Sequence, residues 1–379
     1  MNNIKVGYVS SFAPNNRFAS SGTNYKVVEQ LKKCGEVTWI PITTPKIYRL
    51  FEIIAKILAK LLNKKIYFLY TKIGCKLFAK YQKVATEIEK YDIIFAFFNA
   101  APFYDISTTK PIIYLTDATF PVMIDYYPPF YNLFRFNQRQ GKIIEESIFN
   151  KFKAIICGSD WAAKSVVNDL HQSNKKVYTI EFGANIDTKD IVRHPAKYSG
   201  HLHILFLGVD WKRKGGDIAV KTCKLLIENN IQTTLHIVGI KNLNTEISHL
   251  SFVDNIGFLD KNIPQQYKHL LEIIKISHLL LLPTIAECAG IAFAEASAFG
   301  LPVFTYDTGG IPNYVSNGEN GYKLPITSSE YDFYEKIKYC LETGALEKMS
   351  SKCVEIYNNK LNWNHWGGEV KKLMNSLLK

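Results

Sequence analysis

Two glutamates and the loop between them are the residues that could most plainly do chemistry. Glu287 and Glu295 are separated by seven residues within Pro283–Pro302, where a buried strand, a loop containing Gly290 and a helix are expected in turn. The backbone N–H groups at the start of such a helix attract anions and hydroxyl oxygens. A carboxylate inside the helix could accept hydrogen bonds from two neighbouring sugar hydroxyls.

The alternative for this pair is ordinary: Glu287 caps the helix and Glu295 lies on a solvated face. The residues around Glu295 argue against it, because they make the helix apolar nearly all round. These neighbours are Ala292, Phe293, Ala294, Ala296 and Ala298. A carboxylate on a mostly buried helix needs a partner, so the sequence predicts one for Glu295.

A second stretch combines three cations with two glycines. In Gly208–Asp217 an expected strand is followed by Lys212, Arg213 and Lys214, and two glycines then open a helix. Glycines let a ligand approach the backbone, and the cations suit a diphosphate leaving group. The alternative is a solvated basic turn. Neither GxxxxGK[ST] nor GxGxxG occurs here, so the stretch is not a nucleotide motif of those types.

No metal ion is expected at these residues. No two aspartates are spaced as Asp-x-Asp, the pair of oxygen ligands that often holds Mg²⁺ or Mn²⁺ on a nucleotide diphosphate. The nine histidines are scattered along the sequence without the spacing of metal ligands. The charge of a leaving group would then be balanced by Arg213, Lys214 and helix dipoles.

The first half of the chain offers two weaker candidates. Gly22 lies in the small-residue loop Ser20–Thr23, where a phosphate or an acceptor could approach the backbone; the alternative is a plain helix N-cap turn. Asp117 follows an expected strand at 111–115, so its carboxylate would point into a cleft. Its alternative role is that of a turn or cap residue.

Short apolar runs that alternate with helix-length segments must position these residues. The expected strands of the first half are Ile4–Val9, Val37–Ile40, Asp92–Phe98, Ile112–Leu115, Ala154–Cys157 and Val177–Ile180. After a polar linker expected at 187–200, the pattern restarts with His203–Gly208, Thr234–Gly239, His278–Leu282 and Val303–Tyr306. This pattern indicates an α/β protein with two doubly wound parallel sheets, whose ligands bind at the carboxyl ends of the strands.

The second half of the chain resembles glycosyltransferase family 4. That family is marked by a Glu-x7-Glu motif, matched by Glu287 and Glu295, and by a following Gly-x-Pro-Val strand, matched by Gly300–Val303. Thr308–Pro312 and Asn317–Gly321 are also similar to the family.

The resemblance implies the GT-B fold, in which two Rossmann-like domains face each other across a cleft. Residues 1–188 would form the acceptor-binding domain and residues 200–361 the domain that binds a nucleotide-sugar donor. A C-terminal helix at about 362–379 would pack back on the first domain.

The resemblance also assigns roles to the candidate residues. Glu295 would bind the ribose, and Lys214 the diphosphate. The donor sugar would be held by Glu287 and by the backbone of Cys288, Ala289, Gly290 and Ile291. Gly22 and Gly208 complete the expected donor-binding residues. The family retains anomeric configuration, usually explained by a front-face departure that the donor phosphate assists.

Three positions depart from the family pattern and leave the donor's identity open. Val209 stands where the family often has Arg, so Arg213 is expected to supply that charge. Asp117 stands near a His of the family's first-domain cleft and is expected to bind a sugar hydroxyl or an acceptor. Asn313 stands where the family often has Glu.

A basic segment accounts for most of the net charge of +12. Between Pro45 and Lys83 ten Lys or Arg stand against one acid, which gives 10 − 1 = +9. The periodicity of 47–62 predicts an amphipathic helix, typical of a membrane-surface element that attracts anionic lipids. The expected membrane-contact residues are Arg49, Lys56, Lys60, Lys64 and Lys65. The alternative is an ordinary first-domain helix with a solvated lysine face; nucleic acid is not an expected partner, because no recognised module accompanies the charge.

Composition bounds the class of protein. Hydrophobic residues make up 47% and charged residues 21%, as in globular proteins with sizeable cores. Seven cysteines without a CxxC pair argue against a disulfide framework. Neither a signal peptide nor an apolar run of about 18–20 residues is seen, so a cytoplasmic protein, peripheral on the membrane at most, is expected.

These features and the resemblance predict a retaining, metal-independent glycosyltransferase without a cofactor. It would move a hexosyl group from a UDP- or GDP-sugar to a glycan or lipid-linked acceptor. Two alternatives stay open. One is a GT-B relative with other chemistry, such as a nucleotide-sugar epimerase or a phosphorylase. The other is a non-catalytic protein whose basic helix binds the membrane surface.

Overall fold

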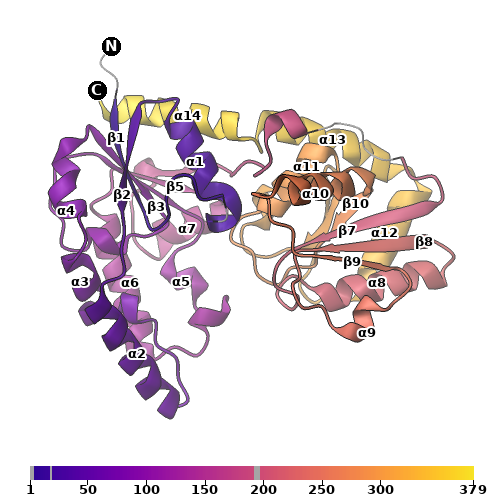
Figure 1. Cartoon of the computed structure of the whole chain (residues 1–379), viewed down its shortest axis with the longest axis horizontal. Coiled ribbons are helices and arrows are strands. Elements are labelled where there is room, and N and C mark those ends of the chain that lie inside the picture. Colours follow the sequence, from indigo (N-terminus) through magenta and orange to yellow (C-terminus); the bar gives the residue numbers. More distant parts are fainter. Residues whose placement is uncertain (1–3, 18, 192–196) are drawn as a thin grey trace. The chain divides into compact units, whose positions relative to one another are not determined.

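The chain forms two compact units. A computed structural model describes residues 4–17, 19–191 and 197–379, so the expected linker at 187–200 lies partly outside the described residues. The N-terminal unit contains residues 1–180 and 367–379, and the C-terminal unit contains residues 181–366 (Figure 1). Each unit is built around a six-stranded sheet.

The N-terminal unit has the strand order β2-β1-β3-β4-β5-β6, and its strand pairs are parallel. The strands are β1 (Lys5–Ser10), β2 (Glu36–Pro41), β3 (Ile93–Phe97), β4 (Ile112–Thr116), β5 (Ala154–Cys157) and β6 (Val177–Thr179). The helices are α1 (Thr23–Leu31), α2 (Lys46–Leu61), α3 (Lys72–Lys80), α4 (Val84–Glu87), α5 (Phe120–Met123), α6 (Arg135–Phe149) and α7 (Asp160–Asn168). The last helix, α14 (Trp363–Leu377), contains the boundary between the units.

The C-terminal unit has the strand order β12-β11-β10-β7-β8-β9, again with parallel pairs. The strands are β7 (His201–Leu207), β8 (Gln232–Val238), β9 (Val253–Gly257), β10 (Leu279–Leu281), β11 (Val303–Tyr306) and β12 (Gly321–Leu324). The helices are α8 (Gly216–Glu228), α9 (Thr245–Ser248), α10 (Pro264–Ile276), α11 (Ile291–Phe299), α12 (Glu330–Glu342) and α13 (Ala345–Asn359).

Five of the inner strands are buried along their whole length, namely β3, β4, β5, β10 and β11. A parallel sheet covered on both faces produces such continuous apolar runs. These runs predict β3, β4, β5, β10 and β11 from the sequence.

Each strand order contains a point at which the chain reverses direction across the sheet. In the N-terminal unit this switch point lies between β1 and β3, and in the C-terminal unit between β7 and β10. The loops that follow the two strands at such a point diverge, which leaves a crevice at the carboxyl edge where doubly wound sheets bind ligands. The loops after β7 and β10 are therefore the place to look for a site.

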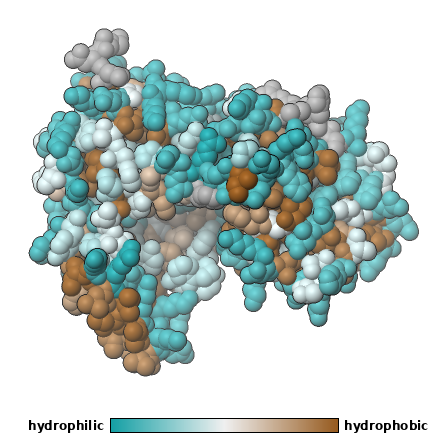
Figure 2. All heavy atoms as spheres, in the orientation of Figure 1, coloured by the Kyte–Doolittle hydropathy of each residue, from teal (hydrophilic) through white to brown (hydrophobic). Residues whose placement is uncertain are grey.

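Helix α2 turns its apolar face outward. Nine large apolar side chains between Ile47 and Leu62 are 39% to 77% exposed, and they form the hydrophobic patch over α2 in Figure 2. They are Ile47, Leu50, Phe51, Ile53, Ile54, Ile57, Leu58, Leu61 and Leu62. The helix is held by a narrow stripe that includes Tyr48 and Ala59, both buried. An ordinary helix would bury its apolar face in the core, whereas α2 leaves most of this face exposed.

Exposed patches of this kind mark surfaces that meet a partner or a membrane. Ile53 and Ile57 widen the face beyond the stripe that the periodicity of the sequence suggests. Among the residues that the structure describes, no helix is long and apolar enough to cross a bilayer.

A buried carboxyl group lies in the N-terminal unit, on α6. Glu145 accepts hydrogen bonds from the Tyr70 hydroxyl (3.0 Å) and from the Phe120 N–H (2.7 Å). Burial raises the pKa of Glu145 from 4.5 to about 8, although the two hydrogen bonds lower it in part. The ring of Tyr70 stacks on Phe120, with 4.4 Å between the ring centroids. Glu145 therefore holds an aromatic cluster together.

This carboxyl group makes the stability of the N-terminal unit depend on pH. Between a pKa of 4.5 in the unfolded chain and about 8 in the folded chain, the folded state binds more protons. The free energy of unfolding should therefore fall as pH rises, by up to about 1.4 kcal/mol per pH unit. Thermal unfolding between about pH 5 and pH 8 measures this slope.

The matched variants are Glu145→Gln and Glu146→Gln, because Glu146 is the next residue on α6 and is only half-buried. We expect Glu145→Gln to lose most of the slope and Glu146→Gln to keep it. An unchanged slope in Glu145→Gln would show that another group is responsible.

Candidate functional site

The turn after β7 holds two cations at the carboxyl edge of the C-terminal sheet. The Lys214 N–H donates to the carbonyl of Asp210 (3.0 Å), and the Arg213 N–H donates to the Asp210 carboxylate (3.1 Å). The Arg213 guanidinium also donates to the carbonyl of Ala286 (2.9 Å), in the loop after β10. Lys214 is only 8% exposed. The turn therefore presents one buried ammonium and one half-buried guanidinium.

Two glycines allow the turn to lie against its neighbours. Gly215 has a φ of +76°, and a Cβ there would lie 2.0 Å from the carbonyl oxygen of Pro283. At Gly208 a Cβ would lie 2.8 Å from Cγ of Lys214. A side chain at either position would push the turn away from the loop after β10. The glycines thus fix where the ammonium of Lys214 lies.

Glu287 lies opposite these cations, on the loop after β10. The Lys214 ammonium donates a hydrogen bond to Oε2 of Glu287, and Nη1 of Arg213 is 3.8 Å from the same oxygen. The loop is held on both sides, by the Ile285 N–H donating to the Arg213 carbonyl (2.9 Å) and the Gly310 N–H donating to the Glu287 carbonyl (2.9 Å). The structure thus brings together Arg213, Lys214 and Glu287 at the switch point of the sheet.

The start of α11 lies directly beyond Glu287. Cys288 and Ala289 are buried, Gly290 caps the helix, and Ile291 begins it. A Cβ on Gly290 would lie 2.6 Å from Cγ of Tyr314, so the loop packs closely there. The first N–H groups of a helix have no acceptor within it, and their partial positive charge favours an anion or a hydroxyl oxygen.

Glu295 has the partner that its buried position requires. It is 4% exposed on α11, and the Lys261 ammonium donates to its Oε1 at 2.6 Å. Lys261 also donates to the carbonyl of Asn185 (3.4 Å). The sequence predicts a partner for Glu295 without naming Lys261, which follows the edge strand β9. No local motif marks this lysine; the buried carboxylate was the signal that a cation was needed.

The remaining two candidates, Gly22 and Asp117, lie in the N-terminal unit. Gly22 has a φ of +100° and begins α1, and Ser20 and Ser21 before it also have positive φ. Such backbone is strained for serine and is typical of functional loops. Asp117 directly follows β4 and is half-buried. Neither residue is within the unit that holds Lys214.

Four of the histidines that are scattered in the sequence are close together in the structure. The rings of His201 and His203 stack at 4.6 Å, and Nδ1 of His203 lies 3.0 Å from Nε2 of His236. The His203 N–H donates to Nδ1 of His278 at 2.9 Å. Burial and the neighbouring rings lower the pKa of His203 to about 4, so it is neutral at pH 7. His201 and His203 lie in the first half of β7 and His278 directly precedes β10, whereas Lys214 follows the carboxyl end of β7; His236 lies on β8.

Known proteins match this part of the chain. Residues 187–359 match the family model described as glycosyl transferases group 1. An uncharacterized glycosyltransferase of Methanocaldococcus jannaschii is 24% identical over 242 residues, 64% of this chain and 64% of that protein. The chain spans 60% to 64% of the length of the first two curated relatives it matches.

Solved structures match over nearly the whole chain. A glycosyltransferase from Rickettsia africae has a TM-score of 0.66 and 16% identity, with all of both chains covered. The Anabaena protein HepE, solved in complex with UDP and glucose, has a TM-score of 0.64 and 13% identity, with 98% of this chain and 100% of that chain covered. The fold is GT-B, as predicted.

The match to the glycosyl transferases group 1 model lies within the C-terminal unit. Lys214, Glu287 and Glu295 lie within the matched residues 187–359, whereas Gly22 and Asp117 lie outside them. Two cations, a carboxylate and the start of α11 thus meet at the switch point of the C-terminal unit, inside the matched range. The matched range does not cover the N-terminal unit.

Proposed function

We propose that the chain is a retaining, metal-independent glycosyltransferase that moves a hexosyl group from a UDP- or GDP-sugar to a glycan or lipid-linked acceptor. The observation that carries the proposal is the ion pair of Lys214 and Glu287 at the switch point of the C-terminal unit. The Anabaena structure supports it, because that protein, which shares the fold, holds UDP and glucose.

Each residue around this pair has a role in the proposal. Lys214 and Arg213 counter the charge of the leaving diphosphate, as preorganised cations do in a site largely shielded from water. Glu287 and the first N–H groups of α11 hold the donor sugar. Glu295 accepts hydrogen bonds from the ribose hydroxyls, while Lys261 holds its Oε1 in place.

The proposed reaction takes place on one face of the sugar. The bond from the anomeric carbon to the phosphate oxygen breaks, and the acceptor hydroxyl oxygen bonds to that carbon from the same side. The hydroxyl proton passes to the departing phosphate oxygen, so the nucleoside diphosphate leaves and the configuration is retained. Lys214 and Arg213 supply the charge that a metal ion supplies elsewhere, in keeping with a sequence that lacks Asp-x-Asp.

The acceptor belongs to the N-terminal unit in this proposal. Asp117, at the carboxyl end of β4, binds an acceptor or sugar hydroxyl. We infer that the outward apolar face of α2 rests on the cytoplasmic side of an anionic membrane, with Arg49 and the nearby lysines toward the headgroups; the exposure of that face supports this inference. Lipid-linked acceptors are therefore favoured over free glycans.

Calorimetry with UDP, GDP and ADP, in the presence and absence of EDTA, tests the donor half of the proposal. We expect one nucleoside diphosphate to bind most tightly, with the same dissociation constant in EDTA. The anomeric configuration of the product, read by NMR, tests retention. Binding of none of the three, with no hydrolysis of UDP- or GDP-sugars, would refute the proposal. Conversion of the donor without an acceptor would indicate an epimerase, and dependence on inorganic phosphate a phosphorylase.

A further inference from the structure

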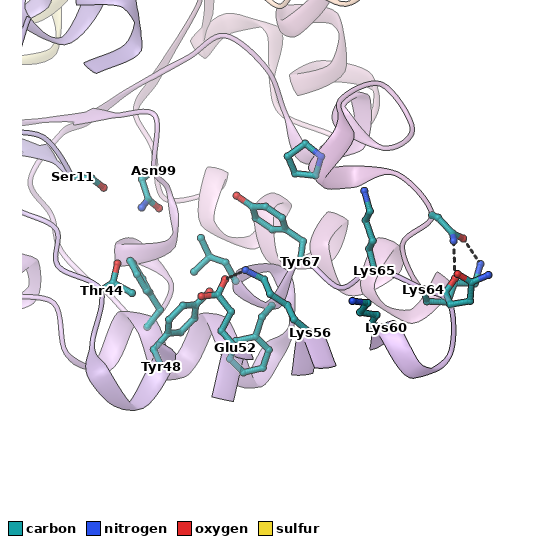
Figure 3. Close-up of a pocket in the computed structure, with 16 residues that line it drawn as sticks. Ser11, Thr44, Tyr48, Glu52, Lys56, Lys60, Lys64, Lys65, Tyr67 and Asn99 are labelled. Atoms are coloured by element: carbon teal, nitrogen blue, oxygen red, sulfur yellow. Dashed lines mark hydrogen bonds and ion pairs between the residues drawn. The ribbon is translucent and has the colours of Figure 1, made fainter. Parts of the chain in front are cut away.

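A hollow of about 900 Å³ opens in the N-terminal unit beside α2 (Figure 3). Four lysines line it, and we call it the lysine pocket: Lys56, Lys60, Lys64 and Lys65. Its volume is in the range of small-molecule sites, which commonly measure about 300–1,000 Å³. The sequence suggests these lysines as membrane contacts but gives no sign that they share a cavity.

The lysine pocket lies where a doubly wound sheet binds ligands. Ser11 follows β1 and Asn99 follows β3, the two strands at the switch point of the N-terminal sheet, and both residues line the pocket. Thr44, beyond the end of β2, lines it too. In Figure 3 these three residues lie on one side of the hollow and Lys60, Lys64 and Lys65 on the other. The residues that follow the carboxyl ends of the strands thus face the lysines across the pocket.

The charge of the lysine pocket is largely uncompensated. Among its lining residues, Glu52 is the one carboxylate, and it pairs with Lys56 at 2.9 Å. Lys64 donates to the amide oxygen of Asn132 (2.7 Å) and Lys65 to the carbonyl of Pro128 (2.7 Å), both neutral acceptors. Like charges gathered in a concave surface create a positive potential that an anion relieves.

Backbone hydrogen bonds hold the part of the pocket wall that carries Lys64 and Lys65. After α2 the chain turns at Asn63, whose φ is +52°, and Lys65 pairs with Leu133 in a parallel bridge. The Lys65 N–H donates to the carbonyl of Asn132 at 3.1 Å. These backbone bonds fix the direction in which both lysines leave the chain.

Two tyrosines add hydrogen-bond donors to the pocket. Tyr67 is positioned by its N–H, which donates to buried Asn137 (2.7 Å), and by its ring, which stacks on Phe130 at 4.6 Å. Burial, with the charge of Glu52, raises the pKa of both Tyr48 and Tyr67. Both hydroxyls therefore stay protonated near pH 7 and can donate to an anion's oxygens.

The same helix presents a cationic flank to the pocket and an apolar face to the outside. Lys56 and Lys60 line the pocket, whereas Leu58 and Leu61 belong to the exposed patch. A ligand that satisfies both surfaces has an anionic head and a hydrocarbon tail. We propose that the lysine pocket binds the phosphate or diphosphate group of a lipid acceptor, whose tail continues into the membrane beside α2. This inference rests on the proposed function, since it names the class of acceptor.

A soluble prenyl diphosphate tests the pocket without vesicles. Calorimetry compares farnesyl diphosphate with inorganic pyrophosphate, in the Lys214→Ala protein so that the donor site does not contribute. The pocket variant is Lys60→Gln/Lys64→Gln. The matched control is Lys72→Gln/Lys76→Gln, which removes the same charge from exposed lysines of α3 outside the pocket. A third variant, Tyr67→Phe, removes one hydroxyl and leaves the charges in place.

We expect farnesyl diphosphate to bind about 10²-fold more weakly to the pocket variant, because two charge-assisted hydrogen bonds are lost. Tyr67→Phe should weaken it by about five- to tenfold. The control should stay within about threefold of the parent. Equal losses in pocket variant and control, or no loss in either, would overturn the inference. Inorganic pyrophosphate binding as tightly as farnesyl diphosphate would overturn the lipid assignment.

The test also separates this inference from the proposed function. Nucleoside diphosphate binding is measured on the protein with Lys214 intact, and the pocket variant should leave it unchanged. Farnesyl diphosphate binding without any nucleotide binding would refute the transferase and spare the pocket. Nucleotide binding without farnesyl diphosphate binding would refute the pocket inference and leave the transferase proposal standing.

Discussion

Replacing Lys214 with alanine should lower kcat/KM for the sugar donor by about 10²- to 10³-fold, the effect of removing one preorganised charge from a developing anion. Lys214 is buried, held by tight packing on Gly208, and aimed at the carboxylate of Glu287. A leaving diphosphate would gain most from such an ammonium, because little water screens it. Steady-state kinetics with the donor identified by calorimetry measure the loss.

Lys212 supplies the matched control for this prediction. It lies in the same turn but is exposed, so Lys212→Ala should change kcat/KM by less than about threefold. The combined variant Lys214→Ala/Glu287→Gln separates structure from catalysis. It removes the carboxylate that Lys214→Ala leaves without its ammonium partner, so its melting temperature should recover while activity stays low. Recovery of activity in the combined variant, or an equal loss in Lys212→Ala, would contradict a direct role for Lys214.

The sequence predicts the inner strands of both sheets and the edge strands β2 and β6 of the N-terminal sheet. Buried runs such as those of β3 and β10 are apolar throughout, because both faces are covered, and their composition alone identifies them. The edge strands β9 and β12 escape this rule. β9 reads Val-Asp-Asn-Ile-Gly and β12 reads Gly-Tyr-Lys-Leu, and both are only partly buried. Their pairing with a neighbour, rather than their own residues, makes them strands.

The residues of the candidate site also differ in whether the sequence predicts them. Lys214 and Glu287 each lie in a loop formed by one continuous stretch of sequence, with glycines where the loop packs closely against its neighbours. The residues of each loop can therefore be predicted. Lys261 cannot, because its contact with Glu295 joins parts of the chain that no motif connects. The direction of α2 is also beyond the sequence: an apolar stripe at helical spacing has the same appearance whether it faces a core or a membrane.

The outward face of α2 leads to the second large effect, on membrane binding. Ile54→Gln/Leu58→Gln/Leu61→Gln should weaken binding to vesicles that contain phosphatidylglycerol by about 10²-fold or more. Each of these side chains is about half exposed or more, and we take about 1 kcal/mol as the value of burying the exposed part of each in the bilayer interface. Co-sedimentation with vesicles measures the change. Binding of the unaltered protein should also weaken as salt rises, because the basic flank contributes by charge.

The melting temperature of this triple variant provides a control for its folding. Polar substitution of three core residues would unfold the unit, whereas these residues are exposed, so the melting temperature should be unchanged or slightly higher. Ile227→Gln/Ile276→Gln/Ile326→Gln alters three comparably exposed isoleucines of the C-terminal unit and should bind vesicles normally. Vesicle binding that survives in the α2 variant would assign the patch to a protein partner instead. A fall in melting temperature as large as that for a core substitution would show that the face is covered in solution, because only a buried apolar side chain stabilises the fold to that extent.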